Sequence, residues 1–258
     1  MTIHYLEDYC IPGKDYSEDA FFLDTNYLIA FITSSHPHHL STVIHTLYLL
    51  QQKAKLYISE TVLSEAVDVL ARGIYTEEQF LLWINSEDHD HWLNEHRGTQ
   101  KEYNDKKDEI RSTFIPNIVK NHESPELLKY YNGKSTEQLE GLIQSRFFKL
   151  SNTTFTVLET GMHFAKSVPL QSNDAFIAAS AAYHSASLLT FDNDIKKVTI
   201  TDPRNGHEVK LFTLKMTNNY LFNKRSHSLM NTLDTSLKNV IEQAVGGPTQ
   251  FVKIFGKS

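Results

Sequence analysis

The sequence predicts an α/β fold, in which a parallel, twisted sheet is flanked by helices. Short apolar runs at residues 21–23, 55–59 and 186–192 have the composition of strands that are buried on both faces. The first two runs are each followed by a segment with helical spacing of apolar residues, and the third is preceded by one. Strands that alternate with helices are typical of a parallel sheet.

Length and composition indicate a globular protein. With 258 residues and 40% hydrophobic content, the chain can bury a substantial core. Its apolar runs are interrupted by charges before the roughly 18 residues of a membrane span, and residues 1–10 lack the basic-then-apolar order of a secretory signal. Cys10 is the only cysteine, which excludes an intramolecular disulfide and a cysteine-rich zinc site. We therefore expect a cytoplasmic protein without membrane association.

The charge distribution is uneven along the chain. The formal net charge of −6 argues against a surface that binds polyanions over its whole extent. From Lys196 onward, however, ten Lys and Arg residues face four Asp and Glu residues. If nucleic acid binds, local basic patches must attract its phosphates, although chance clustering on a solvated surface explains the same pattern.

The first half of the chain is expected to form two strands with helices after them. Residues 21–23 read as a strand, and residues 28–50 are helical in pattern apart from a break at 34–39. Residues 55–59 read as the second strand, which leads into a helix over 60–72 with Ser59 as its N-cap. Residues 76–150 are rich in charge, contain both tryptophans and are expected to be several inserted helices.

The second half is expected to complete the sheet and to add an extension. We expect a strand at 155–158, a short helix near 161–166, an Ala-rich helix over 172–184 and a strand within 186–192. Two β-rich runs around Asn205 and Gly206 predict a hairpin. Apolar residues at 229, 233, 237 and 241 predict an amphipathic helix within 218–244. The predicted organisation is an α/β domain over residues 20–214, with a helical insertion at about 76–150, and a C-terminal basic, amphipathic extension over 215–258.

Acidic residues follow strands or open helices at several places. Asp24 closes the first strand, Glu65 lies early in the helix after the second, Asp174 opens the Ala-rich helix, and Asp192 and Asp194 follow the last strand. In a parallel α/β sheet these positions meet along one edge. Converging carboxylates repel one another, and a divalent cation such as Mg²⁺ or Mn²⁺ relieves that repulsion. Such a site suits phosphodiester hydrolysis, although capping and the helix dipole also favour acids at each position.

Three segments, FFLDTNYLIAFITSSHPHHL, LYISETVLSEAVDVLAR and LQSNDAFIAASAAYHSASLLTFDND, resemble those of PIN-domain nucleases. The resemblance covers roughly residues 20–72 and 154–213. It implies a parallel sheet flanked by helices and an acidic metal site that cuts RNA, or structured DNA in some branches. The site residues that it implies are Asp24 with its supporting neighbours Thr25 and Asn26, then Glu65, Asp174 and Asp192, with Asp194 as an alternative and Thr190 as a supporting hydroxyl.

The sequence departs from that family at three places. The insertion is long for the family, the extension after about residue 214 has no counterpart in its compact toxin members, and Ser185 stands where a helix-ending Gly is expected. None of these departures removes an acidic position. They argue against membership of the small toxin branch rather than against nuclease activity.

Other clusters of ligand-type residues are given structural interpretations. His36, His38 and His39 lie in a proline-containing break, where neighbouring side chains point in different directions, so we expect no metal site there. The segment SEDHDHWLNEH lacks the spacing of a helical zinc motif and is expected to be a solvated helix or loop. Asp68, one turn after Glu65, is expected at the surface. A serine hydrolase or nucleotide-binding enzyme is disfavoured, because neither a G-x-S-x-G motif nor a glycine-rich phosphate loop occurs.

The predicted function is a metal-dependent endoribonuclease, either of a toxin or defence system or of RNA processing. The alternatives are a catalytically silent binding or scaffold module and a nuclease for DNA structures. The expected partners are RNA, an inhibitory or scaffold protein and a second copy of the chain. Lys196 and Lys197 follow the acidic pair directly and are the favoured phosphate contacts. Further candidates are Arg111, Arg146, Lys149, Lys210, Lys224 and Arg225.

Overall fold

The computed structural model describes residues 3–120, 125–215 and 229–244. Within these ranges, six parallel strands form one sheet in the order β1-β6-β5-β2-β3-β4. The strands are β1 (Ile3–Tyr5), β2 (Ala20–Leu23), β3 (Lys55–Ser59), β4 (Lys149–Ser151), β5 (Ser187–Leu189) and β6 (Leu211–Thr213). The prediction of a parallel sheet flanked by helices is confirmed.

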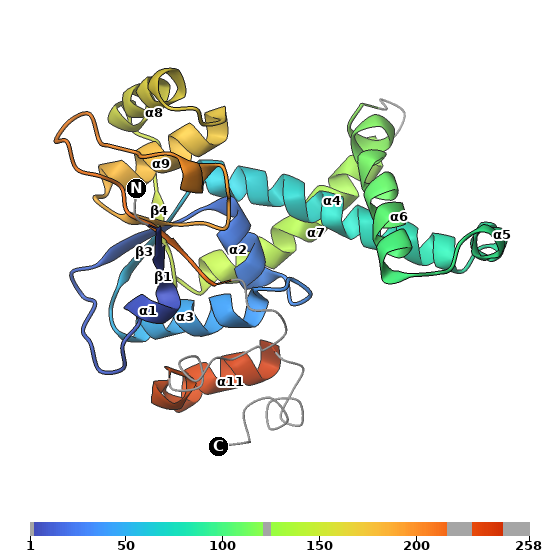
Figure 1. Cartoon of the computed structure of the whole chain (residues 1–258), viewed down its shortest axis with the longest axis horizontal. Coiled ribbons are helices and arrows are strands. Elements are labelled where there is room, and N and C mark those ends of the chain that lie inside the picture. Colours follow the sequence, from blue (N-terminus) through green and yellow to red (C-terminus); the bar gives the residue numbers. More distant parts are fainter. Residues whose placement is uncertain (1–2, 121–124, 216–228, 245–258) are drawn as a thin grey trace. The chain divides into compact units, whose positions relative to one another are not determined.

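Helices occupy most of the remaining described chain (Figure 1). The α-helices are α1 (Leu6–Tyr9), α2 (Thr25–Ile32), α3 (His39–Gln51), α4 (Glu60–Ile84), α5 (Glu87–Glu95), α6 (Gln100–Ser112), α7 (Pro125–Gln144), α8 (Phe155–Ser167), α9 (Ser172–Tyr183) and α11 (Thr235–Ala244). A π-helix, η1 (Ile115–Val119), and a 3₁₀-helix, η2 (Ile195–Lys197), are also present. Among the described helices, none has the length and apolar content that a membrane span requires.

The chain divides into two compact units, and the boundary falls within α4. The first unit contains residues 1–64 and 145–258, and the second contains residues 65–144. The six strands therefore all belong to the first unit.

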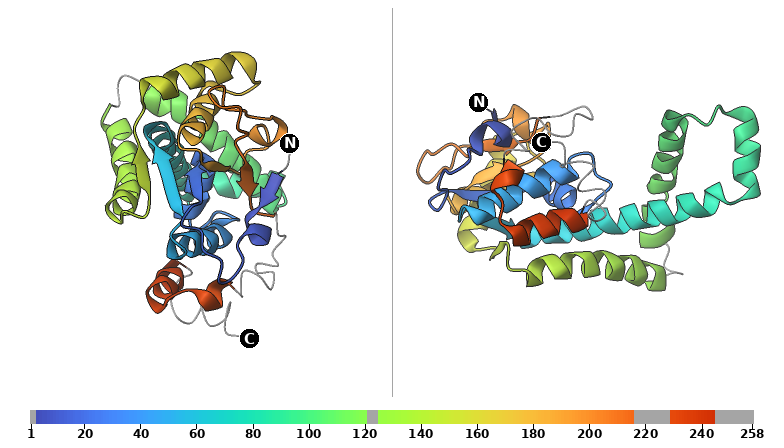
Figure 2. Two further views of the ribbon diagram at one scale, coloured as in Figure 1. Left: turned by 90° about the vertical axis from the view of Figure 1, so that its left-hand side faces the viewer. Right: turned by 90° about the horizontal axis from the view of Figure 1, so that it is seen from below.

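The first unit has three layers. Helix α9 packs on β2 and β5 and carries α8 on its outer side, while α3 packs against α2 and α11 (Figure 2). The centre of the sheet is fully apolar, since Phe21, Phe22 and Leu23 of β2 are at most 1% exposed and Leu188 and Leu189 of β5 are 0% exposed. A strand with both faces covered reads as a continuous apolar run, which is why β2, β3 and β5 could be recognised in the sequence.

The second unit has a core of its own. Ala71 and Tyr75 of α4, Phe114, Ile118 of η1 and Tyr131 of α7 form a buried cluster, with Ile74, Ile110 and Leu128 packed against it. The aromatic rings of Tyr75 and Phe114 lie 5.4 Å apart between their centroids. At the start of α6, Thr99 and Glu102 form a capping box, which satisfies the first backbone donors of that helix.

Several predicted elements match the structure closely. Strand β3 has the predicted limits, and the Ser59 hydroxyl accepts a hydrogen bond from the Val62 amide at 3.2 Å, as expected of an N-cap. The Ala-rich helix is α9. In the C-terminal segment, Leu229, Leu233 and Ile241 are buried as predicted, but the predicted single helix is interrupted at residues 233 and 234 before α11 begins. Residues 218–228 of that segment lie outside the described ranges.

Two predictions about single elements differ from the structure. The strand expected at 155–158 is the first turn of α8, because the Thr154 hydroxyl caps it by accepting from the Val157 amide at 3.3 Å. The expected hairpin is reduced to one antiparallel bridge between Thr201 and Glu208, and its second run joins the main sheet as β6. The N-terminal residues, for which no element was predicted, form β1 and α1, and both elements are too short to show a periodicity in the sequence.

Candidate active site

The candidate site lies where the direction of the strand order reverses. From β2 the chain proceeds to β3 and β4 on one side, whereas β5 and β6 lie on the other. Strands β2 and β5 are paired through Leu23 and Leu189, and the Asp24 amide donates to the Leu189 carbonyl at 3.0 Å. The carboxyl ends of these two strands therefore form the switch point at which α/β sheets bind their ligands.

Asp24 is a buried carboxylate at this switch point. It is 3% exposed and is the N-cap of α2, with its Oδ1 accepting from the Thr25 amide at 2.7 Å. Its Oδ2 accepts from the Thr190 hydroxyl at 2.6 Å. Because burying a carboxylate away from water is costly unless hydrogen bonds replace the water, these bonds fix both oxygens in orientation. Asp24 thus fulfils the capping interpretation and also faces the end of the neighbouring strand.

Thr190 joins Asp24 to Asp192. Its hydroxyl donates to Asp24 and accepts from the Asp192 amide at 2.9 Å. Asp192 is half-buried and stabilises the turn that leads into η2. Its Oδ1 accepts from the Asp194 amide at 2.5 Å and from the Ile195 amide at 3.4 Å. Two of the acids singled out in the sequence are therefore connected through one buried hydroxyl.

The loop that carries Asp192 is held from the other side by Asn26 and by a stack of rings. The Asn26 side-chain oxygen accepts from the Phe191 amide at 2.9 Å. The Phe191 ring lies between Tyr27 and His38, with centroid distances of 5.3 Å and 4.6 Å and interplanar angles of 16° and 12°. Sequence reasoning missed Phe191 and its stack. The only signal was an aromatic residue in an otherwise polar loop.

The remaining predicted acids occupy helices. Asp174 is the third residue of α9 and is half-buried, and α9 leads into β5 after three residues. Glu65 is half-buried in α4 and belongs to the second compact unit. Asp194 is exposed and forms an ion pair with Lys197, between Nζ and Oδ1 at 2.7 Å. Over residues 3–120, 125–215 and 229–244, no three His, Cys, Asp or Glu side chains form a group that could hold a metal ion.

A sequence profile of the PIN domain matches residues 21–200. The chain belongs to the PIN domain family. Members of this family are generally nucleases and typically use divalent metal ions. The chain is also similar to a crystal structure of VapBC2 from Rickettsia felis bound to a DNA fragment from their promoter, at 14% identity and a TM-score of 0.40, over 76% of this chain and 99% of that one. No curated protein matches the chain by sequence.

The histidines of the α2–α3 loop have structural contacts in this PIN domain. His38 stacks on Phe191, and its amide donates to His36 Nδ1 at 3.2 Å. His39 Nδ1 donates to the Ala30 carbonyl at 2.9 Å, and burial lowers the pKa of all three imidazoles. The positive charge of Lys196 lowers the pKa of His38 further.

Two lysines lie directly after the switch-point acids of the PIN domain. Lys196 Nζ donates to the Phe191 carbonyl at 3.1 Å, and partial burial lowers the pKa of this ammonium group. Lys197 is exposed, and its hydrogen bond to Asp194 raises its pKa. Both residues therefore lie in η2, directly after the turn that Asp192 stabilises.

The other predicted phosphate contacts are dispersed. Arg146 and Lys149 are exposed, and Lys149 Nζ lies 5.9 Å from the centroid of the Tyr57 ring on β3. Arg111 belongs to the second unit and lies 3.8 Å from Asp108. Lys224 and Arg225 lie outside the described residues. Lys210 precedes β6 and is therefore at the edge where the strands begin, opposite the switch point.

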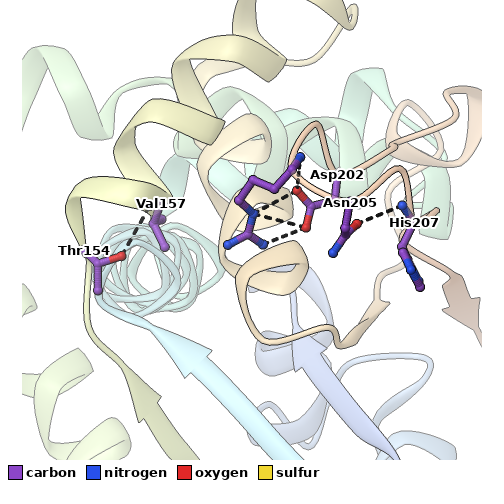
Figure 3. A network of polar contacts seen from close by, with 6 residues as sticks. Thr154, Val157, Asp202, Asn205 and His207 are labelled. Carbon is purple, nitrogen blue, oxygen red and sulfur yellow. Dashed lines mark hydrogen bonds and ion pairs between the residues drawn. The ribbon is translucent and has the colours of Figure 1, made fainter.

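Lys210 lines a cavity of about 260 Å³ at that opposite edge, together with Asp19, Asp202, His207 and Glu208. Asp202 is 2% exposed and forms a two-oxygen ion pair with Arg204, with its shortest contact at 2.7 Å (Figure 3). The Arg204 hydrogen bonds lower the pKa of this carboxyl group. Arg204 thus stabilises the loop before β6 by pairing with Asp202, and the turn-like sequence DPRNG did not reveal this ion pair.

Proposed function

We propose that this PIN domain is a metal-dependent endoribonuclease whose active site is built around Asp24 and Asp192. The observation that carries the proposal is the connection of these two carboxylates through Thr190 at the switch point between β2 and β5. Asp24 already caps α2 through its Oδ1, so helix capping does not require the second hydrogen bond, which Oδ2 accepts from the Thr190 hydroxyl.

Asp174 is proposed as the third acid of the site. It lies in the first turn of α9, the helix that leads into β5. In a parallel α/β unit such a helix runs back across the sheet, so its first turn is expected near the edge where the strands end. Asp194 is the alternative to Asp192. Glu65 is proposed as an additional catalytic acid from the family resemblance and is tested separately.

The donor chemistry of these residues fits Mg²⁺ or Mn²⁺. Both ions prefer carboxylate oxygens, and these acids supply them. Asp24, Asp174 and Asp192 would hold the ion. When bound, it lowers the pKa of water and offsets negative charge on the scissile phosphate.

The protein's own residues orient this site and bind the substrate. Thr190 fixes the Asp24 carboxylate, while Asn26 and the ring stack on Phe191 hold the loop of Asp192. Lys196 and Lys197 lie on the same loop and are proposed to bind RNA phosphates, with Arg146 and Lys149 as further contacts. Thr25 donates its amide to Asp24 and supports its orientation.

Cleavage of end-labelled RNA tests the proposal, with Mg²⁺, Mn²⁺ or a chelator and with single-stranded and branched DNA as competing substrates. The variants are Asp24→Asn, Asp192→Asn, Asp174→Asn and Glu65→Gln. Since Asn caps helices about as well as Asp, Asp24→Asn should keep the fold while cleavage falls by at least about 100-fold. Asp15→Asn is the matched control, because Asp15 is exposed and accepts from the Ser17 amide within its own turn.

The outcomes separate the candidate functions. Metal-dependent RNA cleavage that is lost in Asp24→Asn and retained in Asp15→Asn supports the proposal, and full activity of both variants overturns it. Preferential cleavage of branched DNA would identify a structure-specific DNA nuclease. Absence of cleavage together with absence of calorimetric metal binding would identify a binding or scaffold module.

A further inference from the structure

The second compact unit carries the excess negative charge of the chain. Residues 65–144 contain 16 Asp and Glu against nine Lys and Arg, a net charge of −7, whereas the rest of the chain has a net charge of +1. A surface of this sign repels nucleic acid phosphates. The net charge of this unit therefore favours a basic ligand over RNA or DNA.

Both tryptophans of the chain lie in one group of rings at the α4–α5–α6 end of this unit. The ring cluster, as we call it, consists of Trp83, His89, Trp92, His96 and Tyr103. Trp92 is at its centre, with centroid distances of 5.2 Å to Trp83, 5.1 Å to Tyr103 and 4.4 Å to His96. Figure 1 shows α5 joining the end of α4 to the start of α6.

The ring cluster is only partly covered by the described parts of the chain, where Lys106 Nζ lies 5.4 Å from the centroid of the Trp83 ring. None of the residues of α5 is buried, Trp83, Trp92 and Tyr103 are only half-buried, and Leu93 beside Trp92 is 41% exposed. Leu93 and Tyr103 both lie against Gly98, so this leucine borders the ring cluster. An isolated helix of nine residues is marginal in water, and here it is anchored mainly through half-exposed rings. Exposed aromatic and aliphatic side chains in contact are typical of protein interaction sites.

The charges of α5 are left without cationic partners. This helix carries Glu87, Asp88, Asp90 and Glu95 and contains neither Lys nor Arg, and none of its carboxylates forms an ion pair with any other described residue. Two of the three lysines of α6 form ion pairs with acids outside α5. Lys106 pairs with Glu109 at 2.9 Å and Lys107 pairs with Glu77 at 2.8 Å.

We propose that α5 and the ring cluster form a docking surface for a basic protein segment that carries apolar anchor residues. Its Lys or Arg side chains would pair with the four carboxylates of α5, and its apolar side chains would cover Trp92 and Leu93. Aromatic anchors in an interface with complementary charge are the usual centre of binding energy. The proposal concerns the second unit alone and does not depend on nuclease activity.

A defined set of peptides tests the docking surface on the full chain. The probe is an amphipathic peptide of Leu and Lys, about four helical turns long. Its two counterparts replace every Leu by Ser or every Lys by Glu. Binding is measured by calorimetry and by tryptophan emission, which reports on the ring cluster because it contains both tryptophans. The Leu/Lys peptide should bind at least tenfold more tightly than either counterpart and change the emission.

Two chain variants locate the binding surface. The combined substitution Glu87→Gln, Asp88→Asn, Asp90→Asn and Glu95→Gln should weaken binding at least tenfold, as should Leu93→Ser alone. The control removes as many exposed acids from α6 and α7 through Asp105→Asn, Glu126→Gln, Glu137→Gln and Glu140→Gln, and it should bind like the wild type. Equal weakening in the control, equal binding of the Ser peptide, an emission change with single-stranded RNA, or concentration-dependent self-association that buries the tryptophans without peptide would each overturn the proposal.

Discussion

Thr190 and Asp24 are separated by 166 residues in the chain, yet the Thr190 hydroxyl donates to Asp24 Oδ2 at 2.6 Å. The bond connects the residue that follows β2 with the residue that follows β5, at the point where the strand order reverses. Thr190 is 0% exposed, so neither partner can exchange this bond for water. The stability of the strand ends and the orientation of the candidate catalytic acid therefore depend on the same hydroxyl.

Replacing Thr190 by Val should destabilise the protein measurably. The substitution keeps the shape of the side chain but removes a donor to Asp24 and an acceptor for the Asp192 amide. Leaving a buried polar group without a partner costs about 1–3 kcal/mol, so the loss of both bonds is expected to lower the free energy of unfolding, measured with urea, by about 2–6 kcal/mol. Thr190→Ser retains the hydroxyl and should lose clearly less. Equal stability of Val and Ser variants would show that the hydroxyl contributes nothing.

His38 should act through its ring rather than through its nitrogens. Its imidazole stacks on Phe191 next to Asp192, so His38→Ala removes one side of the stack, which we expect to cost about 1 kcal/mol and to reduce cleavage. His38→Phe preserves a stacking ring but can neither bind a metal nor transfer a proton. Retained stability and cleavage in His38→Phe would support the packing role. Loss of activity in both variants would instead favour a chemical role for the imidazole.

The predictable parts of the fold are the strands that are covered on both faces and the helix that packs closely on them. The runs of β2, β3 and β5 and the Ala-rich α9 have compositions that only a buried strand or a closely packed helix needs. The start of α8 misled because Thr, Phe and Val favour strands, whereas the Thr154 cap decides the local structure. Local composition could not reveal this contact of one side chain with one amide.

The candidate site was predictable as positions but not as contacts. The sequence indicated Asp24 and Asp192 because they follow buried strands, whereas Thr190 was implied only by the family resemblance. The hydrogen bonds between the three residues follow from the pairing of β2 with β5. Phe191 and His38 could not be paired from the sequence, since their stacking depends on how the α2–α3 loop folds over the strand ends. The second unit's core was hidden for the same reason, because Tyr75, Phe114 and Tyr131 come from three separate segments.

Removing Phe114 should destabilise the second unit. This residue is 3% exposed and contacts Tyr75 and Tyr131 through its ring. A Phe→Ala substitution in a core costs about 3–5 kcal/mol, because a cavity is left where the ring was. Tryptophan emission during urea unfolding reports on this unit, which contains Trp83 and Trp92. Leu127→Ala, at a 43% exposed position of α7, is the control, and an equal shift in both variants would contradict a core role for Phe114.

His45 should make the folded state less stable as the pH falls below neutrality. Its ring is 0% exposed, Nδ1 donates to the Ser41 carbonyl at 2.7 Å, and Nε2 has no hydrogen-bond partner among the described residues. Burial lowers its pKa to about 4, whereas an unfolded histidine titrates near 6.5. Between these values the unfolded chain binds a proton that the folded chain does not, so the stability present above pH ~6.5 is lost progressively toward pH ~4.

The expected loss through His45 is about 3 kcal/mol over that interval, since each pKa unit corresponds to about 1.4 kcal/mol. Urea unfolding at several pH values between 4.5 and 7 measures it. His45→Gln removes the titrating ring and should flatten the pH dependence by about one proton, whereas His163→Gln, at an exposed position of α8, should leave the slope unchanged. The buried His39 and the half-buried His36, His38 and His184 also have lowered pKa values and add to the slope in the same direction, whereas Glu7, whose pKa is raised by burial, opposes it. An unchanged slope in His45→Gln would show that His45 is protonated within the folded protein.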